Sequence, residues 1–276
     1  MIELPEAMTI AKQMNYELNG KKIEHGNRGN SPHKFAFYTR SPEEYESIFA
    51  GKTIGGSKYH GSLIVTEIGS EYALVLGGGG EKILLHQSEK TLPKKYQLLL
   101  EFSDETYLTV TVQGWGSVQL YDRPELATHP YLKNSGVSPI GDDFTYDYFQ
   151  SLFDELKEDD KRSAKFFIIS KPGIWGVANG YLQDILFRAK IYPRRRVIDL
   201  SENERSALYE AIRETMTQAV NLNGRDDESD LYGNKGKYKR ILDSRTNGTP
   251  CPECGTTIEK ISFLGGAAYF CPSCQV

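Results

Sequence analysis

The chain has 276 residues, of which 39% are hydrophobic and 25% are charged, and its formal net charge is −4. This composition is typical of a folded globular protein and excludes a disordered or fibrous chain. No run of about 18 apolar residues is present and the first residues lack the basic start of a signal peptide, so we expect neither a membrane span nor secretion. The small negative charge does not indicate a nucleic-acid-binding protein, so such a role would depend on local patches.

The N-terminal part of the chain combines one helix with many short strands. Residues 6–18 carry apolar side chains at helical spacing directly after Pro5, which predicts an amphipathic helix. Short alternating runs separated by turn residues then predict an antiparallel β-sandwich or barrel. The four glycines at 77–80 are interpreted as a hairpin turn, because no Gly-Lys-Ser/Thr sequence of a phosphate loop follows. The predicted strands cover residues 62–68, 72–76, 82–86, 96–102, 107–112 and 117–121.

From Asp142 onward the pattern becomes helical. We expect Asp142 or Asp143 to cap a helix that runs to residue 156, and the stretch 223–237 to be flexible or disordered. Further helices are predicted at 162–169, 180–189 and 202–221. The predicted domains are an N-terminal helix and sandwich at 1–128, a connector at 129–141, a helical domain at 142–240 and a β-hairpin at 241–276.

Basic residues gather in two stretches that contain no acidic residue. Such runs most often form a solvated face, and a nucleic-acid contact is the alternative. The first stretch contains Arg188, Lys190, Arg194, Arg195 and Arg196, and the second contains Lys235, Lys237, Lys239 and Arg240.

The cysteines form the strongest motif, two C-x-x-C pairs separated by 16 residues. This spacing is typical of a zinc site in which four thiolates bind one ion in a tetrahedron. Because four protein ligands leave no position for water, the zinc would be structural rather than catalytic. Two disulfides or free thiols are the alternative, which the lack of a secretory signal disfavours. The predicted ligands are Cys251, Cys254, Cys271 and Cys274.

The residues between the two cysteine pairs predict a β-hairpin. Short strands are expected at 256–260 and 267–270, around a turn formed by Leu264, Gly265 and Gly266. A hairpin of this size is too small to fold alone, so it must dock on the rest of the chain or on a ligand.

Three segments, in this order along the chain, carry a family resemblance. They are the N-terminal MIELPEA, the segment GIWGVANGY at 173–181 that continues into DILFRAKIYP, and the C-terminal CPECG to FCPSCQ. Together they resemble the formamidopyrimidine-DNA glycosylase and endonuclease VIII family over nearly the whole chain. The resemblance implies an α+β multidomain fold with an N-terminal antiparallel β-sandwich, a helix-two-turns-helix domain and a C-terminal zinc β-hairpin, with DNA bound between the domains.

The resemblance also implies a chemistry at the N-terminus. In this family a terminal proline amine attacks C1′ of a flipped, damaged nucleotide to form a Schiff base, and the next residue is a Glu that moves protons at the sugar. Glu3 matches that Glu, and Glu6 matches the sequence that follows. Ile2 stands where the proline is expected, so we expect Met1 to be retained. The amine would then lie up to about 3.5 Å from its family position, which predicts a large loss of rate.

Two further cations of the family are replaced. Ser62 stands at the position of a hairpin lysine, with Lys58 and His60 nearby, and Gly266 stands at the position of the zinc-hairpin arginine. Among the residues that fill the gap left by a flipped base, the resemblance retains an aromatic side chain, Trp115, of the kind that kinks DNA by partly unstacking a step.

Other family positions are retained. Lys165 and Asn179 match a phosphate-binding lysine and asparagine, Tyr181 matches the motif tyrosine, and Asp184 stands where the family has an acidic residue. The predicted DNA contacts are therefore Lys165, Asn179 and Tyr181, together with Lys58, His60 and Trp115. From the residues alone, Asn179 could equally cap the following helix and Trp115 could pack in a core.

The predicted function follows from which residues of the family's functional positions are retained in this sequence and which are replaced. We expect a DNA-binding protein of the base excision repair type that recognises damaged or distorted duplex DNA, with glycosylase and AP-lyase activity lost or weak. An active glycosylase that uses the N-terminal amine and Glu3 is the first alternative, and a zinc-hairpin module that binds a protein is the second. One structural zinc ion is the expected cofactor. We further expect a monomer in the cytoplasm, associated with the nucleoid when bound to DNA.

Overall fold

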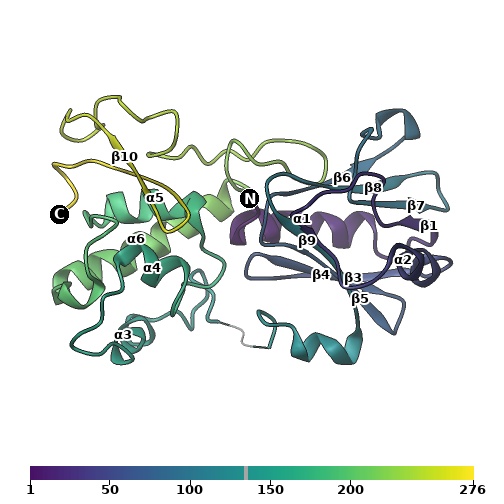
Figure 1. Cartoon of the computed structure of the whole chain (residues 1–276), viewed down its shortest axis with the longest axis horizontal. Coiled ribbons are helices and arrows are strands. Elements are labelled where there is room, and N and C mark those ends of the chain that lie inside the picture. Colours follow the sequence, from purple (N-terminus) through teal and green to yellow (C-terminus); the bar gives the residue numbers. More distant parts are fainter. Residues whose placement is uncertain (134–135) are drawn as a thin grey trace. The chain divides into compact units, whose positions relative to one another are not determined.

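The computed structural model describes residues 1–133 and 136–276 of the chain (Figure 1). They form an N-terminal unit of Met1–Ser135 and Leu222–Lys237, and a C-terminal unit of Gly136–Asn221 and Tyr238–Val276. The stretch 222–237 thus belongs with the sandwich, whereas the sequence grouped it with the helices. The predicted connector at 129–141 includes residues 134–135, which lie outside the described residues, and the domain boundaries stay predictions.

The N-terminal unit contains two sheets, and the predicted antiparallel sandwich is confirmed. The larger sheet has the strand order β2-β9-β5-β4-β3, antiparallel except for the pair β2 and β9, and the smaller has the order β1-β7-β8-β6. The strands of the larger sheet are β2 (Ala36–Phe37), β9 (Gly116–Asp122), β5 (Tyr72–Gly77), β4 (Leu63–Ile68) and β3 (Ile54–His60). Those of the smaller sheet are β1 (Ile23–Asn27), β7 (Leu98–Phe102), β8 (Tyr107–Val112) and β6 (Glu81–His86).

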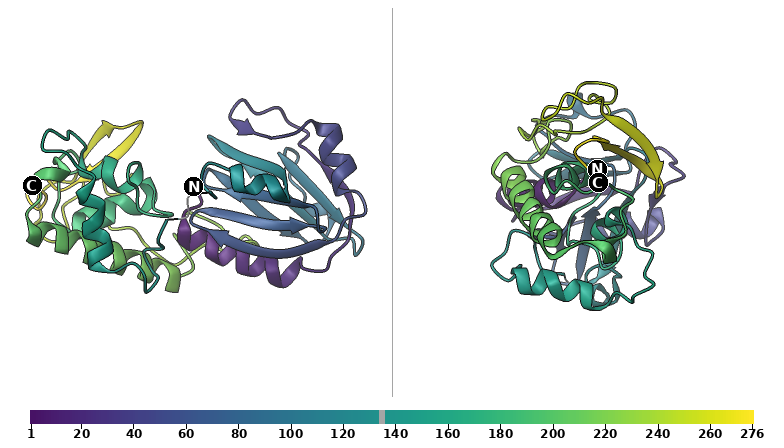
Figure 2. Two further views of the ribbon diagram at one scale, coloured as in Figure 1. Left: turned by 90° about the horizontal axis from the view of Figure 1, so that it is seen from below. Right: turned by 90° about the vertical axis from the view of Figure 1, so that its left-hand side faces the viewer.

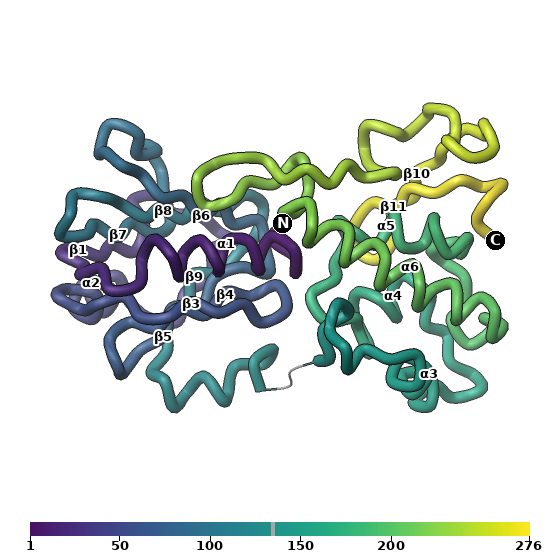
Figure 3. Tube along the Cα trace, turned by 180° about the vertical axis from the view of Figure 1, so that it is seen from behind, coloured from purple at the N-terminus to yellow at the C-terminus, as the bar shows by residue number. Residues whose placement is uncertain are grey.

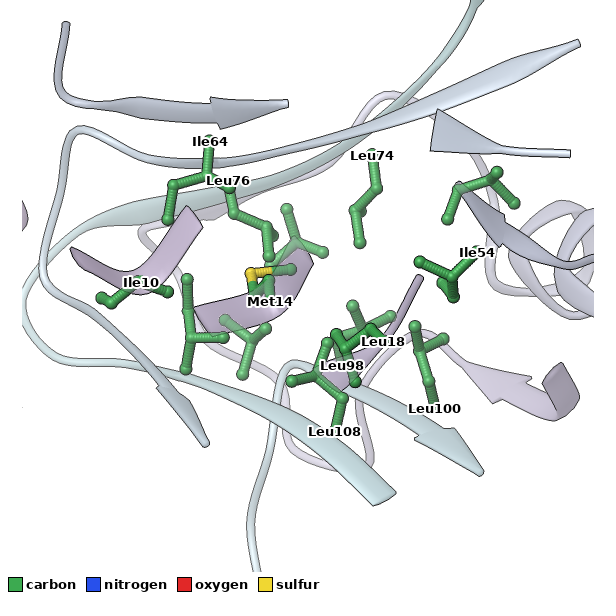
Figure 4. Packing of buried hydrophobic residues seen from close by; sticks show 14 of the residues in the cluster. Ile10, Met14, Leu18, Ile54, Ile64, Leu74, Leu76, Leu98, Leu100 and Leu108 are labelled. Carbon is green, nitrogen blue, oxygen red and sulfur yellow. The ribbon is translucent and has the colours of Figure 1, made fainter. Parts of the chain in front are cut away.

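The core of this unit lies between the two sheets and the first helix. Helix α1 (Leu4–Glu17) runs alongside the strands (Figure 2) and buries Ile10 and Met14. Figure 4 shows these side chains with Ile64, Leu74 and Leu76 of the larger sheet and with Leu98, Leu100 and Leu108 of the smaller one. Each such buried aliphatic side chain contributes about 1.5–3 kcal/mol. The apolar spacing at 6–18 therefore predicted the helix correctly, although it begins two residues earlier.

The interpretation of the glycines at 77–80 as a hairpin turn is wrong. Strands β5 and β6 belong to different sheets, so the glycines connect the two layers rather than two paired strands. A Cβ added to Gly80 would lie 1.9 Å from the backbone oxygen of Gln113, so the close approach of two backbones requires glycine there. The sequence analysis also missed strands β1, β2 and β3 and the helix α2 (Pro42–Phe49), which Ser41 caps.

The stretch predicted to be flexible, 223–237, has a defined path along the N-terminal unit (Figure 3). Leu231 is fully buried in the core, and its carbonyl accepts a hydrogen bond from the Leu85 N–H at 2.9 Å. The Gln13 side chain donates to Asp230 at 2.9 Å and accepts from the Leu231 N–H at 3.0 Å. The prediction of disorder fails because turn-rich composition does not reveal these long-range bonds.

The C-terminal unit packs four helices around aromatic side chains. The helices are α3 (Tyr146–Asp154), α4 (Ala164–Ile169), α5 (Asn179–Arg188) and α6 (Glu202–Asn221). Thr145 caps α3 by accepting from the Tyr148 N–H, so the predicted cap at Asp142 or Asp143 is wrong. Ser163 caps α4 in the same way. Short 3-10 turns η1 (Glu89–Thr91) and η2 (Arg123–Thr128) lie in the other unit, and η3 (Val197–Asp199) lies in this one.

The C-terminal β-hairpin consists of β10 (Glu259–Phe263) and β11 (Gly266–Phe270), paired antiparallel. The first strand lies three residues later than predicted, and Gly266 belongs to the second strand rather than to the turn. The turn is formed by Leu264 and Gly265, with φ of 53° and 72°. Two successive residues with positive φ match the right-handed twist of the strands they join.

Candidate functional site

The four cysteines lie together in the C-terminal unit. Their sulfur atoms all lie within 4.8 Å of one another, with Cys251 Sγ 3.9 Å from Cys274 Sγ and Cys254 Sγ 3.5 Å from Cys271 Sγ. Two thiolates bound to one zinc ion at about 2.3 Å stand roughly 3.8 Å apart in a tetrahedron. A disulfide would require about 2.05 Å. The residues therefore fit one structural zinc ion, which all four cysteines would bind.

The zinc hairpin is held on α4 and α5 by three polar side chains. Lys165 donates from Nζ to the carbonyl oxygens of Phe263 at 2.8 Å and Ala267 at 3.4 Å. The Asn179 and Gln183 amides donate to the same Ala267 oxygen at 3.2 and 3.1 Å. The Gln183 oxygen also accepts from the Tyr269 N–H at 3.1 Å.

Burial shifts the pKa values of Lys165 and Asp184, two charged residues at family positions that the sequence retains. Lys165 is fully buried, and this desolvation lowers the pKa of its ammonium group. Asp184 is also fully buried, and burial raises the pKa of its carboxyl although hydrogen bonds oppose the shift. Asp184 accepts from the backbone N–H groups of Ile241 and Leu242 and from the Tyr238 hydroxyl, all at 2.8–3.0 Å. Asp184 therefore positions the segment that leads into the zinc hairpin.

In the N-terminal unit, a buried arginine lies among the predicted catalytic carboxylates. Arg225 is 2% exposed, and its Nη1 lies 3.1 Å from Glu3 Oε1 and 3.6 Å from Glu6 Oε2. The Arg225 backbone N–H also donates to Glu6 at 3.0 Å. Glu3 is fully buried and Glu6 is 3% exposed. A Cβ on Gly224, whose φ is +86°, would lie 2.8 Å from Glu6 Oε1, so glycine permits the close approach.

Glu3 and Glu6 also cap the N-terminal end of the first helix. Glu3 is the N-cap of α1, its N–H donates to Glu6 at 3.0 Å, and the two residues form a capping box. Negative charge at a helix N-terminus is stabilised by the helix dipole. Both carboxylates therefore have a structural role at this helix end.

The first two residues are fixed by the same segment. The Met1 amine forms an ion pair with Glu228, and the Met1 carbonyl accepts from Arg225. Ile2 is 2% exposed, and its N–H donates to the Gly79 carbonyl at 2.7 Å. Burial raises the pKa of Glu228, but the amine and Arg225 outweigh it and the net pKa is lowered.

The other predicted DNA contacts are distributed over both units. Lys58 is exposed on β3, and His60 is half-buried at the end of that strand, where burial lowers its pKa. Trp115 is 48% exposed directly before β9. Tyr181 is fully buried and packs edge-on against Tyr238 at 5.4 Å. Within each unit, the structure brings Met1, Ile2, Glu3 and Glu6 together, and Lys165 and Asn179 together.

Sequence reasoning missed Arg225, Glu228 and Gln183. Gln183 follows Asn179 by four residues on α5, so helical spacing could have placed both on one face. Arg225 and Glu228 lie 219 to 227 residues from their partners at the N-terminus, and no local pattern indicates them.

Comparisons with known proteins agree with these features. The model of the formamidopyrimidine-DNA glycosylase H2TH domain matches residues 136–229, and that of a zinc finger found in FPG and IleRS matches residues 248–276. Formamidopyrimidine-DNA glycosylases from Lactococcus lactis subsp. lactis and Halalkalibacterium halodurans are 28% and 29% identical to the chain. Each match covers 100% of this chain, and 99% and 100% of the respective relatives.

Solved structures give the same result. A complex of Lactococcus lactis Fpg with DNA containing an abasic site matches with a TM-score of 0.82 at 25% identity, over 99% of both chains. A complex of that enzyme with DNA containing an oxidized pyrimidine matches with a TM-score of 0.81, also at 25% identity and over 99% of both chains. These matches include the sandwich, the H2TH helices and the four-cysteine hairpin. The chain is therefore similar over its whole length to proteins of the formamidopyrimidine-DNA glycosylase family.

Among the described residues, no helix is both long enough and apolar enough to cross a membrane.

Proposed function

We propose that this protein binds duplex DNA that is damaged or distorted, and that its glycosylase and AP-lyase activity is lost or weak. The binding part rests on similarity to the family and on its solved relatives, which are complexes with DNA containing an abasic site or an oxidized pyrimidine. We also propose that the protein acts as a monomer in the cytoplasm, associated with the nucleoid when bound to DNA.

The ion pair between Glu3 and Arg225 is the main observation that supports the proposed loss of activity. A general acid or base must reach the reacting atoms within hydrogen-bond distance. Glu3 is fully buried and its carboxylate contacts a guanidinium that is itself 2% exposed. A sugar could reach Glu3 only after Arg225 moved away. The buried side chain of Ile2 occupies the position of the family's proline, which removes the usual nucleophile as well.

Borohydride trapping on duplexes that contain an abasic site or 8-oxoguanine tests this proposal. We expect little or no adduct with 8-oxoguanine and at most weak β-elimination at the abasic site. Efficient base excision that Glu3→Gln abolishes would instead establish an active glycosylase that uses Glu3 and the N-terminal amine. The amine lies in the same cluster as Glu3, which favours this as the second candidate. Intact mass measures whether Met1 is retained.

The reverse experiment restores the replaced groups together, as Ile2→Pro, Ser62→Lys and Gly266→Arg. A Cβ on Gly266 would lie 3.5 Å from the Asn179 side chain, an ordinary contact, so the backbone accepts a side chain there. Recovery of trapping would attribute the loss to these three positions. No recovery would mean that the cleft has diverged beyond these three positions, and the Arg225 cluster, which the triple variant leaves unchanged, would be the next region to test.

The role of Lys165 in DNA binding is tested by the salt dependence of duplex affinity. A lysine that contacts a phosphate contributes about 0.9 to the slope of log affinity against log salt. Replacing a lysine that supports the hairpin would speed the release of zinc, because two carbonyls lose their donor. We expect Lys165→Met to show both effects, and Lys161→Met, an exposed lysine before α4, to show neither. Unchanged duplex affinity at low salt would exclude a phosphate contact.

A further inference from the structure

Three large aromatic side chains lie exposed at one edge of the larger sheet. Phe35 and Phe37 are each 51% exposed, and Trp115 is 48% exposed. Edge strand β2 pairs in parallel with β9, with Ala36 beside Gly116. Phe35 and Trp115 directly precede the paired residues Ala36 and Gly116, and Phe37 follows Ala36, so the three aromatic residues are neighbours at this sheet edge. Exposed aromatic side chains that gather in one place indicate an interaction site.

The backbone beneath these side chains is firmly held. The Gly116 N–H donates to the Phe35 carbonyl at 3.0 Å, and the Gly80 N–H donates to the Trp115 carbonyl at 2.8 Å. Glu81, which is 3% exposed, accepts from the backbone N–H of Ser117 at 2.7 Å. The aromatic side chains are therefore presented to solvent on an ordered backbone, so a ligand need not order it on binding.

The stretch of chain that contains Phe35 and Phe37 is basic, and so is a second stretch that is hydrogen-bonded to it. Residues 25–42 and 90–100 contain no Asp or Glu, and they carry exposed Lys34, Lys94 and Lys95. The two stretches are joined by Asn30, whose side chain donates to the Lys94 carbonyl at 3.0 Å and accepts from the Tyr96 N–H at 3.0 Å. Lys34 also lies 5.5 Å from the centre of the Phe35 ring. The surface thus combines planar apolar groups with cations, which complements stacked bases on an anionic backbone.

We propose that this aromatic and basic surface binds a short single-stranded stretch of DNA. Unpaired bases stack on Phe35, Phe37 and Trp115, and the lysines contact the phosphates. Base stacking on aromatic side chains is tolerant of sequence, because every base has a π face. The inference rests on the proposed DNA-binding function and adds to it a site for unpaired bases within the N-terminal unit. A protein segment on this face is the competing occupant, and the experiment below separates the two.

The first test measures the binding of a fluorescein-labelled short oligothymidine to the full-length protein by fluorescence anisotropy. We expect Phe35→Ala and Phe37→Ala each to weaken binding on the order of tenfold. Tyr16→Ala is the matched control, since Tyr16 is 83% exposed on α1 in the same unit, and its affinity should equal that of the wild type. Lys34→Met should reduce the salt slope by about 0.7, the value for one contact to a single strand.

The second test uses the fluorescence of Trp115 in a Trp175→Phe background, because the chain contains two tryptophans. Stacking of a base on the indole should quench this emission as oligothymidine is added. Absence of quenching, or equal affinity of the Phe35→Ala and Tyr16→Ala variants, would overturn the inference. Urea unfolding curves that coincide for these variants will exclude a loss of folding.

Failure of the inference differs from failure of the proposed function. A protein that binds duplex DNA but not oligothymidine retains the proposed function and excludes the single-strand surface, which leaves a protein segment as its occupant. A protein that binds oligothymidine but not duplex DNA excludes duplex recognition and supports the surface. Binding of neither probe contradicts both proposals.

Discussion

The Arg225 cluster of the N-terminal unit and the cysteine cluster of the C-terminal unit solve the same physical problem in different ways. Each gathers anionic side chains around one cation and thereby fixes an irregular segment of chain. In the first, Arg225 lies among Glu3, Glu6 and Glu228. In the second, the sulfur atoms of four cysteines are arranged to hold one zinc ion. Buried like charges are strongly unfavourable unless a cation compensates them, so each segment depends on its cation.

The difference between the clusters lies in where the cation comes from. The guanidinium of Arg225 is part of the chain and stays charged at all accessible pH values, so its cluster cannot lose its cation to a chelator. Zinc is taken from solution, and its binding energy becomes folding energy of the hairpin. The N-terminal cluster therefore carries its own cation, whereas the hairpin is conditional on metal. Glu3 and Glu6, which the sequence predicted as catalytic carboxylates, thus have a structural role that depends on no ion from solution.

Of the changes considered for the two clusters, removal of zinc should cause the largest loss of structure. Structural zinc binds to zinc-finger peptides with about 10–16 kcal/mol, so chelation or Cys271→Ser should remove the hydrogen-exchange protection of β10 and β11. Peptides from β4 and β5 should keep their protection, because they belong to the other unit. Less than about half an equivalent of zinc in protein purified without chelator would contradict the site, as would unchanged protection after chelation.

Removal of Arg225 should give the next largest effect. Arg225→Met leaves Glu3 and Glu6 buried without their guanidinium, which should cost about 3–5 kcal/mol in the free energy of unfolding of the N-terminal unit. Trp115 fluorescence in a Trp175→Phe background reports urea unfolding of this unit. Adding Glu3→Gln to Arg225→Met should restore part of the loss, because the amide carries no charge.

The matched control for Arg225 is Arg123→Met. Arg123 pairs with Glu67 at 3.1 Å, but both side chains are at least 40% exposed, so the loss should be below about 1 kcal/mol. If the two arginine variants lose equal amounts of unfolding free energy, burial does not increase the contribution of Arg225 to stability.

The same contrast explains what the sequence could predict. The zinc site could be predicted because all four ligands lie within 24 residues, at a spacing in the sequence that is typical of zinc sites. The helix at 202–221 and most strands were predicted correctly because their patterns are local. Arg225 was missed because its partners are set by tertiary packing, and the glycines at 77–80 were misread because composition does not distinguish a hairpin from a connection between sheets. The burial of Lys165 beneath the hairpin was likewise invisible in sequence.

The smallest effect on the free energy of unfolding is expected at Glu228. The sign of this effect follows from the direction in which the pKa of the carboxyl is shifted. Burial raises the pKa of this carboxyl, but the Met1 amine and Arg225 lower it more, so the folded pKa lies below the unfolded value of about 4.3. The stabilisation is therefore fully present above that value and is lost as the pH falls through the folded pKa. The Met1 and Glu228 side chains are 35% and 22% exposed, which limits the gain to about 1 kcal/mol or less.

Urea unfolding of the wild type and of Glu228→Gln across pH measures this contribution. The difference in the free energy of unfolding should be constant at neutral pH and shrink below about pH 4, because the wild-type carboxyl then becomes neutral like the amide. Glu46→Gln, an exposed acid in α2, should show no comparable gap. Acetylation of the N-terminal amine should reduce the gap at neutral pH, since it removes one partner of the ion pair. A gap that persists undiminished at about pH 3 would mean that packing rather than charge joins Glu228 to the N-terminus.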